Sequence, residues 1–172
     1  MTRFQHALKV VLGHEGGYVN DKADRGGATN FGVTTSTYHA YLLERNRPLK
    51  PVAEITQAEV EDIYSNYWRD AHCSYLVEPL DLLVFDSAIN HGPNRAIKLL
   101  QRALGVDEDG ICGRNTLAAL HEEVVAVGVE SVCQQYLNER EAFYDRIIER
   151  DPTQAKFARG WGNRVEHLRE MV

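Results

Sequence analysis

The chain contains 172 residues, of which 44% are hydrophobic and 26% are charged. This composition is typical of one globular domain, or of one core with a subdomain. The formal net charge is −6 and no long basic run occurs, which argues against binding to nucleic acid. No segment approaches the ~20 apolar residues of a membrane span, which argues against stable membrane association.

Residues 1–12 predict an amphipathic helix. The apolar positions that share one face are Phe4, Ala7, Leu8, Val11 and Leu12. The segment lacks the charged start, apolar centre and small-residue cleavage site of a signal peptide. We therefore expect synthesis in the cytoplasm without a signal peptide, followed by release through another factor if the protein acts outside.

A glycine-rich run begins where this helix should end. Glu15 precedes Gly16 and Gly17, and Asp24 follows Glu15 nine positions later, in a stretch with too many glycines for a helix. Residues 18–33 therefore predict a small lobe of strands and turns. Glycoside hydrolysis requires two carboxylates on opposite walls of a cleft. One protonates the leaving oxygen, and the other activates water or stabilises the sugar cation.

Each polar residue of this run has a functional and a structural interpretation. At the carboxyl end of a helix and beside apolar walls, Glu15 would have the raised pKa that a general acid requires. Alternatively, it is an exposed residue at a helix end. Asp24 would serve as the second carboxylate or cap a turn. Thr29 would hold the attacking water or fill a strand position, and Tyr18 would line a sugar cleft or pack in the core.

The rest of the sequence predicts helices. Prolines, glycines and capping residues place them at 34–44, 56–69, 79–92, 93–104, 115–122 and 128–150, with a last helix from 153. We find no internal repeat and no low-complexity linker. The predicted fold class is therefore mainly α, with a small β/loop lobe near residues 18–33.

Four side chains in these predicted helices invite a functional interpretation. Asp86, Asn90 and Gln101 are polar residues on otherwise apolar helices, and a buried polar group must find a partner. They either tie the core together or form hydrogen bonds with a substrate. Trp68 either packs in the core or stacks on a sugar face.

Metal and nucleophile chemistry receive little support from the sequence. Cys73, Cys112 and Cys133 are odd in number and lack C-x-x-C spacing, so we expect small, partly buried hydrophobic residues instead of disulfides or a zinc site. The histidines are scattered, without zinc-binding spacing after His14, and no serine nucleophile motif occurs. The sequence thus predicts no metal and no cofactor.

The N-terminal string reads Glu15-Gly-Gly-Tyr-x5-Asp24-x-Gly-Gly-x-Thr29-x-x-Gly32-Val-Thr. It resembles the glycosyl hydrolase family 108 muramidases, which include phage endolysins and secretion-associated muramidases. It is less similar to the phage-type lysozymes, in which the threonine stands one residue further from the aspartate. The downstream strings Phe85-Asp86-x-Ala88-x-Asn90-x-Gly92 and Asp109-Gly110-x-x-Gly113-x-x-Thr116 resemble the join to the family's C-terminal helical region, which is labelled a predicted peptidoglycan-binding domain. The resemblance covers nearly the whole chain.

This resemblance implies a lysozyme-like helical fold, with a catalytic region at 1–92 and a helical peptidoglycan-binding-like region at 93–172, packed as one globular unit. It implies an N-acetylmuramidase that cleaves the β-1,4 bond between N-acetylmuramic acid and N-acetylglucosamine, for host lysis or for protein release through the cell wall. The implied catalytic residues are Glu15, Asp24 and Thr29, and the expected substrate-binding residues are Tyr18, Trp68, Asn90 and Gln101.

The implied partners are peptidoglycan and a holin-like release factor, and the expected protein is a monomer that acts in the periplasm or cell wall. The likeness to inverting phage lysozymes favours inversion at the anomeric carbon, which requires a carboxyl separation of roughly 6.5–9.5 Å. Three alternatives stay open: a lytic transglycosylase, a non-catalytic peptidoglycan-binding module, and a zinc amidase or peptidase.

Overall fold

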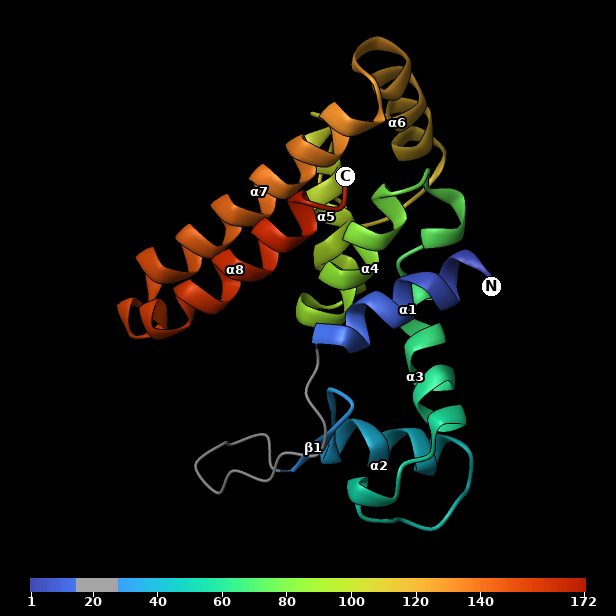
Figure 1. Ribbon diagram of the computed structural model, residues 1–172. Helices are drawn as coiled ribbons and strands as arrows, with labels where there is room; N and C mark the ends of the chain where they lie inside the picture. The colour runs from blue at the N-terminus through green and yellow to red at the C-terminus, as the bar shows by residue number, and fades with distance from the viewer. Residues whose placement is uncertain (15–27) are drawn as a thin grey trace. The chain divides into compact units, whose positions relative to one another are not determined.

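The computed structural model describes residues 1–14 and 28–172. The chain divides into two compact units, Met1–Asn66 and Tyr67–Val172, and helices predominate in the described part of each (Figure 1). The predicted mainly α fold class is thereby confirmed.

The first unit builds a small hairpin among helices. Its described elements are α1 (Arg3–His14), β1 (Thr29–Asn30), β2 (Val33–Thr34), α2 (Thr35–Glu44), the 3₁₀ helix η1 (Val52–Glu54) and most of α3 (Gln57–Asp70), within which the unit ends. Thr34 caps α2, as predicted, because its side chain accepts a hydrogen bond from the Thr37 backbone N–H. The hairpin confirms strands at the end of the predicted lobe, and residues 18–27 of that lobe lie outside the described residues.

Helix α1 has the predicted amphipathic character. Ala7, Leu8 and Val11 are buried, whereas Lys9 is exposed. Apolar side chains three and four positions apart share one face of a helix, so this stripe packs inward. The helix is described as far as His14, the residue before Glu15.

Polar contacts join α2 to α3 in the first unit. The Tyr38 hydroxyl donates to Glu59 Oε2 at 3.0 Å, and Arg47 Nη1 lies 2.7 Å from Glu59 Oε1. Thr56 completes the predicted capping box: its backbone N–H donates to Glu59 Oε2 at 2.9 Å, and its hydroxyl accepts from the Glu59 N–H at 3.3 Å. One buried carboxylate therefore both starts α3 and attaches it to α2.

The second unit surrounds one buried helix. Its elements are η2 (Cys73–Tyr75), α4 (Leu80–His91), α5 (Pro93–Ala103), α6 (Arg114–Val127), α7 (Val129–Arg150), η3 (Pro152–Phe157) and α8 (Ala158–Arg169). Every residue of α4 from Leu80 to Ala88 is buried. Helices α5 and α7 contact α4, and α8 runs beside α7 (Figure 1). Because α4 is buried on all sides, its polar side chains need partners inside the protein.

Two predicted helix boundaries in this unit differ from the structure. The helix predicted at 115–122 extends to Val127, since packing against α7 outweighs the small helix penalty of β-branched residues, and Gly128 ends it at φ 85°. The last helix begins at Ala158 instead of 153. Asp151 accepts a hydrogen bond from the Thr153 N–H and starts the 3₁₀ helix η3 in between.

Thr56→Ala should lower the free energy of unfolding by about 1 kcal/mol, because the first turn of α3 loses its hydroxyl acceptor. Urea denaturation followed by circular dichroism measures this change. Thr56→Ser is the matched control: it keeps the hydroxyl and should stay within about 0.5 kcal/mol of the natural protein. Equal destabilisation by both variants would contradict the capping role.

Candidate functional site

Three of the predicted site residues, Glu15, Tyr18 and Asp24, lie outside the residues that the structure describes. Their roles therefore stay predictions. The other four predicted site residues are described: Thr29 belongs to the hairpin of the first unit, and the remaining three belong to the second unit.

Thr29 lies on the first strand of a tight hairpin. The register pairs Thr29 with Thr34. Phe31 and Gly32 form the two-residue turn with φ values of 50° and 71°, the positive values of a type I′ hairpin turn. A turn this short fixes the register, and the register fixes the face to which each side chain points. The half-buried Thr29 side chain therefore has a defined place on one face of the hairpin.

Side chains from elsewhere in the first unit hold this hairpin in place. The Tyr64 hydroxyl of α3 donates to the Phe31 carbonyl at 2.8 Å. Asn30 Nδ2 donates to the Val52 carbonyl of η1 at 3.4 Å. A hydroxyl that positions a reacting water needs a rigid support of this kind. The sequence does not single out Tyr64, because a tyrosine on a helical stripe carries no mark of its distant acceptor.

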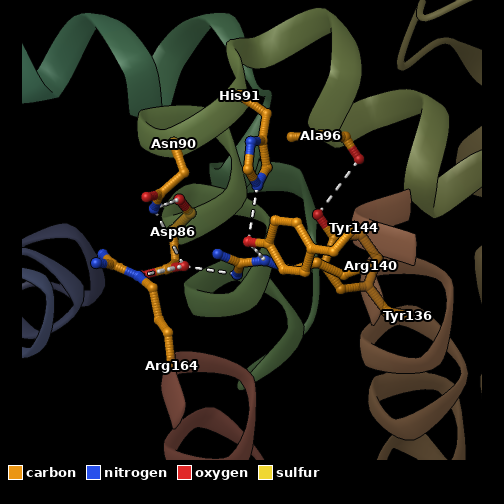
Figure 2. A network of polar contacts seen from close by, with 8 residues as sticks. All are labelled: Asp86, Asn90, His91, Ala96, Tyr136, Arg140, Tyr144 and Arg164. Atoms are coloured by element: carbon orange, nitrogen blue, oxygen red, sulfur yellow. Dashed lines mark hydrogen bonds and ion pairs between the residues drawn. The ribbon is translucent and has the colours of Figure 1, made fainter. Parts of the chain in front are cut away.

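A buried charged cluster surrounds Asp86 in the second unit (Figure 2). Arg140 Nη1 of α7 lies 2.6 Å from Asp86 Oδ2. Arg164 of α8 reaches both carboxylate oxygens, with Nη2 2.7 Å from Oδ1 and Nε 2.9 and 3.1 Å from the two oxygens. Asp86 and Arg140 are each 0% exposed. Burial opposes the charge on Asp86, but the guanidinium groups of Arg140 and Arg164 outweigh burial and lower its pKa.

Tyr144 extends the cluster to His91 (Figure 2). The Tyr144 hydroxyl accepts a hydrogen bond from Arg140 Nε at 3.0 Å and lies 2.9 Å from His91 Nε2. A guanidinium only donates, so the tyrosine proton points toward His91, whose Nε2 accepts it. Burial, together with the Arg140 charge, lowers the pKa of His91 to about 4. The ring is therefore neutral at neutral pH, as its acceptor role requires.

Asn90 stands at the exposed edge of this cluster. Its Nδ2 donates to the Asp86 backbone carbonyl at 2.7 Å and lies 3.5 Å from Asp86 Oδ2. The residue is exposed, unlike the polar residues deeper in α4. Asn90 thus supports the cluster and also presents polar surface to solvent, which is compatible with both predicted roles.

Trp68 is buried and packs inside the second unit. Its Nε1 donates to Ser74 Oγ at 2.8 Å, and its ring meets Phe85 edge to face with centroids 5.3 Å apart. The residue is 7% exposed, which leaves little ring surface for stacking on a sugar. The structure thus favours the packing interpretation of Trp68.

Gln101 organises the loop that follows α5. Its Nε2 lies 2.6 Å from Asp109 Oδ1 and 3.1 Å from Thr116 Oγ1, and its Oε1 accepts from the Gly110 N–H at 2.8 Å. The residue is 1% exposed. Because these hydrogen-bonding groups are used inside the protein, Gln101 builds the Asp109–Gly110 turn, and its geometry favours the structural interpretation.

The described ranges 1–14 and 28–172 contain no evident metal site or reactive thiol. Within them, no group of three or more His, Cys, Asp or Glu side chains could hold a metal ion. Cys73, Cys112 and Cys133 are buried free thiols, and burial raises the pKa of Cys133 to about 12. Among the helices described, none is both long enough and apolar enough to cross a membrane.

Sequence reasoning also missed the two arginines of the Asp86 cluster. A signal exists for Arg140, which stands four positions from both Tyr136 and Tyr144 and so shares their buried face of α7. An arginine on such a face requires a buried anion. Arg164 carries no comparable signal, because α8 is short and mostly polar.

Comparison with known proteins gives two family matches and matches to solved structures, one of which covers nearly the full chain. The family model Glycosyl hydrolase 108 matches residues 8–92, and the model Predicted Peptidoglycan domain matches residues 95–166. The solved structure of SagA from Brucella abortus is 33% identical, with a TM-score of 0.81, and the match covers 98% of this chain and 92% of the SagA chain. Comparison with curated proteins finds no match.

The Asp86 cluster joins the two matched regions. Asp86 belongs to the region 8–92, whereas Arg140 and Arg164 belong to the region 95–166. The charge of Asp86 in the first matched region is therefore neutralised by side chains of the second.

Asp86→Asn should lower the free energy of unfolding by about 3–5 kcal/mol at pH 7, because it removes the anion that pairs the buried Arg140 and the half-buried Arg164. A lowered folded-state pKa stabilises the fold above the unfolded pKa of about 3.9 and loses that contribution as pH falls through the folded value. Urea unfolding should therefore show a difference between the two proteins that shrinks below about pH 4. The exposed Asp145→Asn is the control, and a difference as small as that of this control would contradict the assignment.

Proposed function

Because this chain belongs to the glycosyl hydrolase 108 family, and is thus a glycoside hydrolase that acts on peptidoglycan, we propose that it is an N-acetylmuramidase. It hydrolyses the β-1,4 bond between N-acetylmuramic acid and N-acetylglucosamine. The observation that carries this proposal is the family match to residues 8–92, a stretch that includes Glu15 and Asp24.

The proposed mechanism assigns a separate task to each residue of the N-terminal run. Glu15 donates a proton to the leaving glycosidic oxygen, and Asp24 activates a water on the opposite face of the sugar. Thr29 holds that water through its hydroxyl, a role supported by the anchored hairpin on which it lies. Attack from the opposite face inverts the anomeric carbon.

The proposed substrate contacts are Tyr18 and Asn90. The exposure of Asn90 and the hydrogen bond that orients its amide support a contact with polar groups of the glycan or its peptide. Trp68 and Gln101 act from the core, since their burial and internal hydrogen bonds support a structural contribution.

The proposed catalytic region, 1–92, and the proposed peptidoglycan-binding-like region, 93–172, work as one globular unit. The ion pairs of Asp86 with Arg140 and Arg164 support this proposal, since they link the two regions within the second compact unit. The protein acts as a monomer in the periplasm or cell wall after a holin-like factor releases it. There it serves host lysis or the release of proteins through the wall.

Glu15→Gln should leave the fold intact and reduce hydrolysis of purified peptidoglycan by about 10²–10⁴-fold, because an amide cannot donate the proton. The release of reducing sugar measures the rate, and circular dichroism checks the fold. Turnover close to that of the natural protein would overturn the assignment of Glu15.

Product masses then separate hydrolysis from transglycosylation. Mass spectrometry of the natural protein's products should show reducing N-acetylmuramic acid ends. Anhydro ends, lighter by one water, would instead identify a lytic transglycosylase.

Asp24→Asn should slow hydrolysis by about 10²–10³-fold, and Thr29→Ala should be milder, because a carboxylate stabilises developing positive charge better than a hydroxyl does. Thr29→Ser keeps the hydroxyl and should retain most of the rate. Initial rates on purified peptidoglycan give the order of the variants. A silent Asp24→Asn would reduce Asp24 to a turn cap. In NMR spectra of the first products, an initial β-anomer would contradict inversion.

A further inference from the structure

A concave site lies in the first unit, next to the hairpin. It is a cavity of about 400 Å³ between the start of the hairpin, α2, and the chain that leads into η1. The residues that matter for its chemistry are Ala28, Thr35, His39, Lys50 and Pro51. Thr29, the proposed catalytic residue that the structure describes, does not line it.

Hydrogen bonds fix the walls of this cavity. His39 Nε2 lies 3.0 Å from the Lys50 carbonyl, which can only accept, so this nitrogen carries the proton. The Thr35 hydroxyl donates to the Ala28 carbonyl at 2.9 Å, and the Thr35 N–H donates to the same oxygen at 3.0 Å. The backbone on both sides is therefore held in place, and a ligand meets a preformed surface.

The lining combines apolar groups with one positive charge. Ala28, Pro51 and their neighbours supply apolar surface, and none of the described residues that line the cavity carries a carboxylate. Lys50 is half-buried, and the ion pairs found between described residues do not include it. A chain with a net charge of −6 thus presents a local positive site here. The matching ligand has a carboxylate beside small apolar groups.

We propose that this cavity binds the acidic, alanine-containing stem peptide of peptidoglycan, with Lys50 as the partner of a peptide carboxylate. The inference rests on the proposed function, because a stem peptide is attached to each muramic acid next to the bond that the enzyme cleaves. The peptide combines carboxylates with alanine methyl groups, which are the two features that the lining accommodates.

The cavity also lies close to Thr29 along the chain. Ala28 is its neighbour in sequence, and successive residues of an extended chain point to opposite faces. The Ala28 side chain is therefore expected on the face opposite that of Thr29, and the cavity adjoins the hairpin strand that carries Thr29. A peptide held there restrains the glycan strand close to the proposed water site without occupying that site, so it should lower KM and leave kcat nearly unchanged.

The test compares two substrates: peptidoglycan with its stem peptides, and glycan strands from which an amidase has removed them. Lys50→Glu should raise KM on the peptide-bearing substrate at least about tenfold, and Lys50→Ala should raise it several-fold. On the stripped strands both variants should match the natural protein. These strands keep the lactyl carboxylate of muramic acid but have no peptide carboxylates. The comparison therefore distinguishes binding of the lactyl carboxylate from binding of a peptide carboxylate.

Lys156→Glu is the control, because it changes the net charge equally at an exposed position of the second unit. An equal effect of this control, or an equal effect of Lys50→Glu on both substrates, would overturn the proposal. So would a Lys50→Glu protein that matches the natural protein on the peptide-bearing substrate.

A direct measurement of peptide binding tests the proposed site even if the protein cleaves a bond other than the β-1,4 glycosidic bond proposed above. A synthetic stem tripeptide, titrated into the Glu15→Gln protein, should shift the NMR signals of residues 49–53. The shifts should disappear when Lys50→Glu is added. If the natural protein cleaves neither substrate but the peptide still shifts these signals, the proposed function fails and the binding site stands. Unchanged signals would refute the binding site.

Discussion

A carboxylate without exposed surface stays ionised only where cations surround it, and Asp86 is such a carboxylate. Its helix, α4, is buried on all sides from Leu80 to Ala88, so the carboxylate has no contact with water and needs cations from neighbouring helices. Arg140 and Arg164 do so from α7 and α8, which fixes both helices against α4. The Tyr144 hydroxyl then accepts a hydrogen bond from Arg140 Nε and orients His91 (Figure 2). The pairing of one negative charge thus determines how three helices meet.

In the first unit, the hairpin is too short to be stable alone and depends on contacts with the rest of the unit. Each strand has two residues, and an isolated hairpin is marginal even when it is longer. Backbone carbonyls of the hairpin therefore receive side-chain donors, from Tyr64 at the turn and from Thr35 at its base. The same Thr35 contact forms a wall of the Lys50 cavity. The proposed water-holding hydroxyl and the proposed peptide site consequently share one scaffold.

Local signals in the sequence predicted most of the helices. They did not predict the ion pairs between residues that are far apart in the sequence. Thr34 and Thr56 each lie within three residues of the backbone group that they cap. A short stretch of sequence is therefore enough to predict these helix starts. The apolar helix around Asp86 predicts that this carboxylate has a buried partner. It does not identify that partner, because Arg164 is 78 residues away in the sequence. Glu15 and Asp24 were proposed from spacing and family resemblance. Both residues lie outside the described residues.

The same separation of 78 residues affects how the protein is made. A ribosome adds about 5–20 residues per second, so roughly 4–16 s pass between the synthesis of Asp86 and that of Arg164. During this interval α4 carries a carboxylate that lacks its final cation, and its burial cannot be completed. The core of the second unit, which contains Asp86, is therefore complete only after α8 has been made. The residues that match the two family models thus share an ion-pair cluster that is completed only late in synthesis.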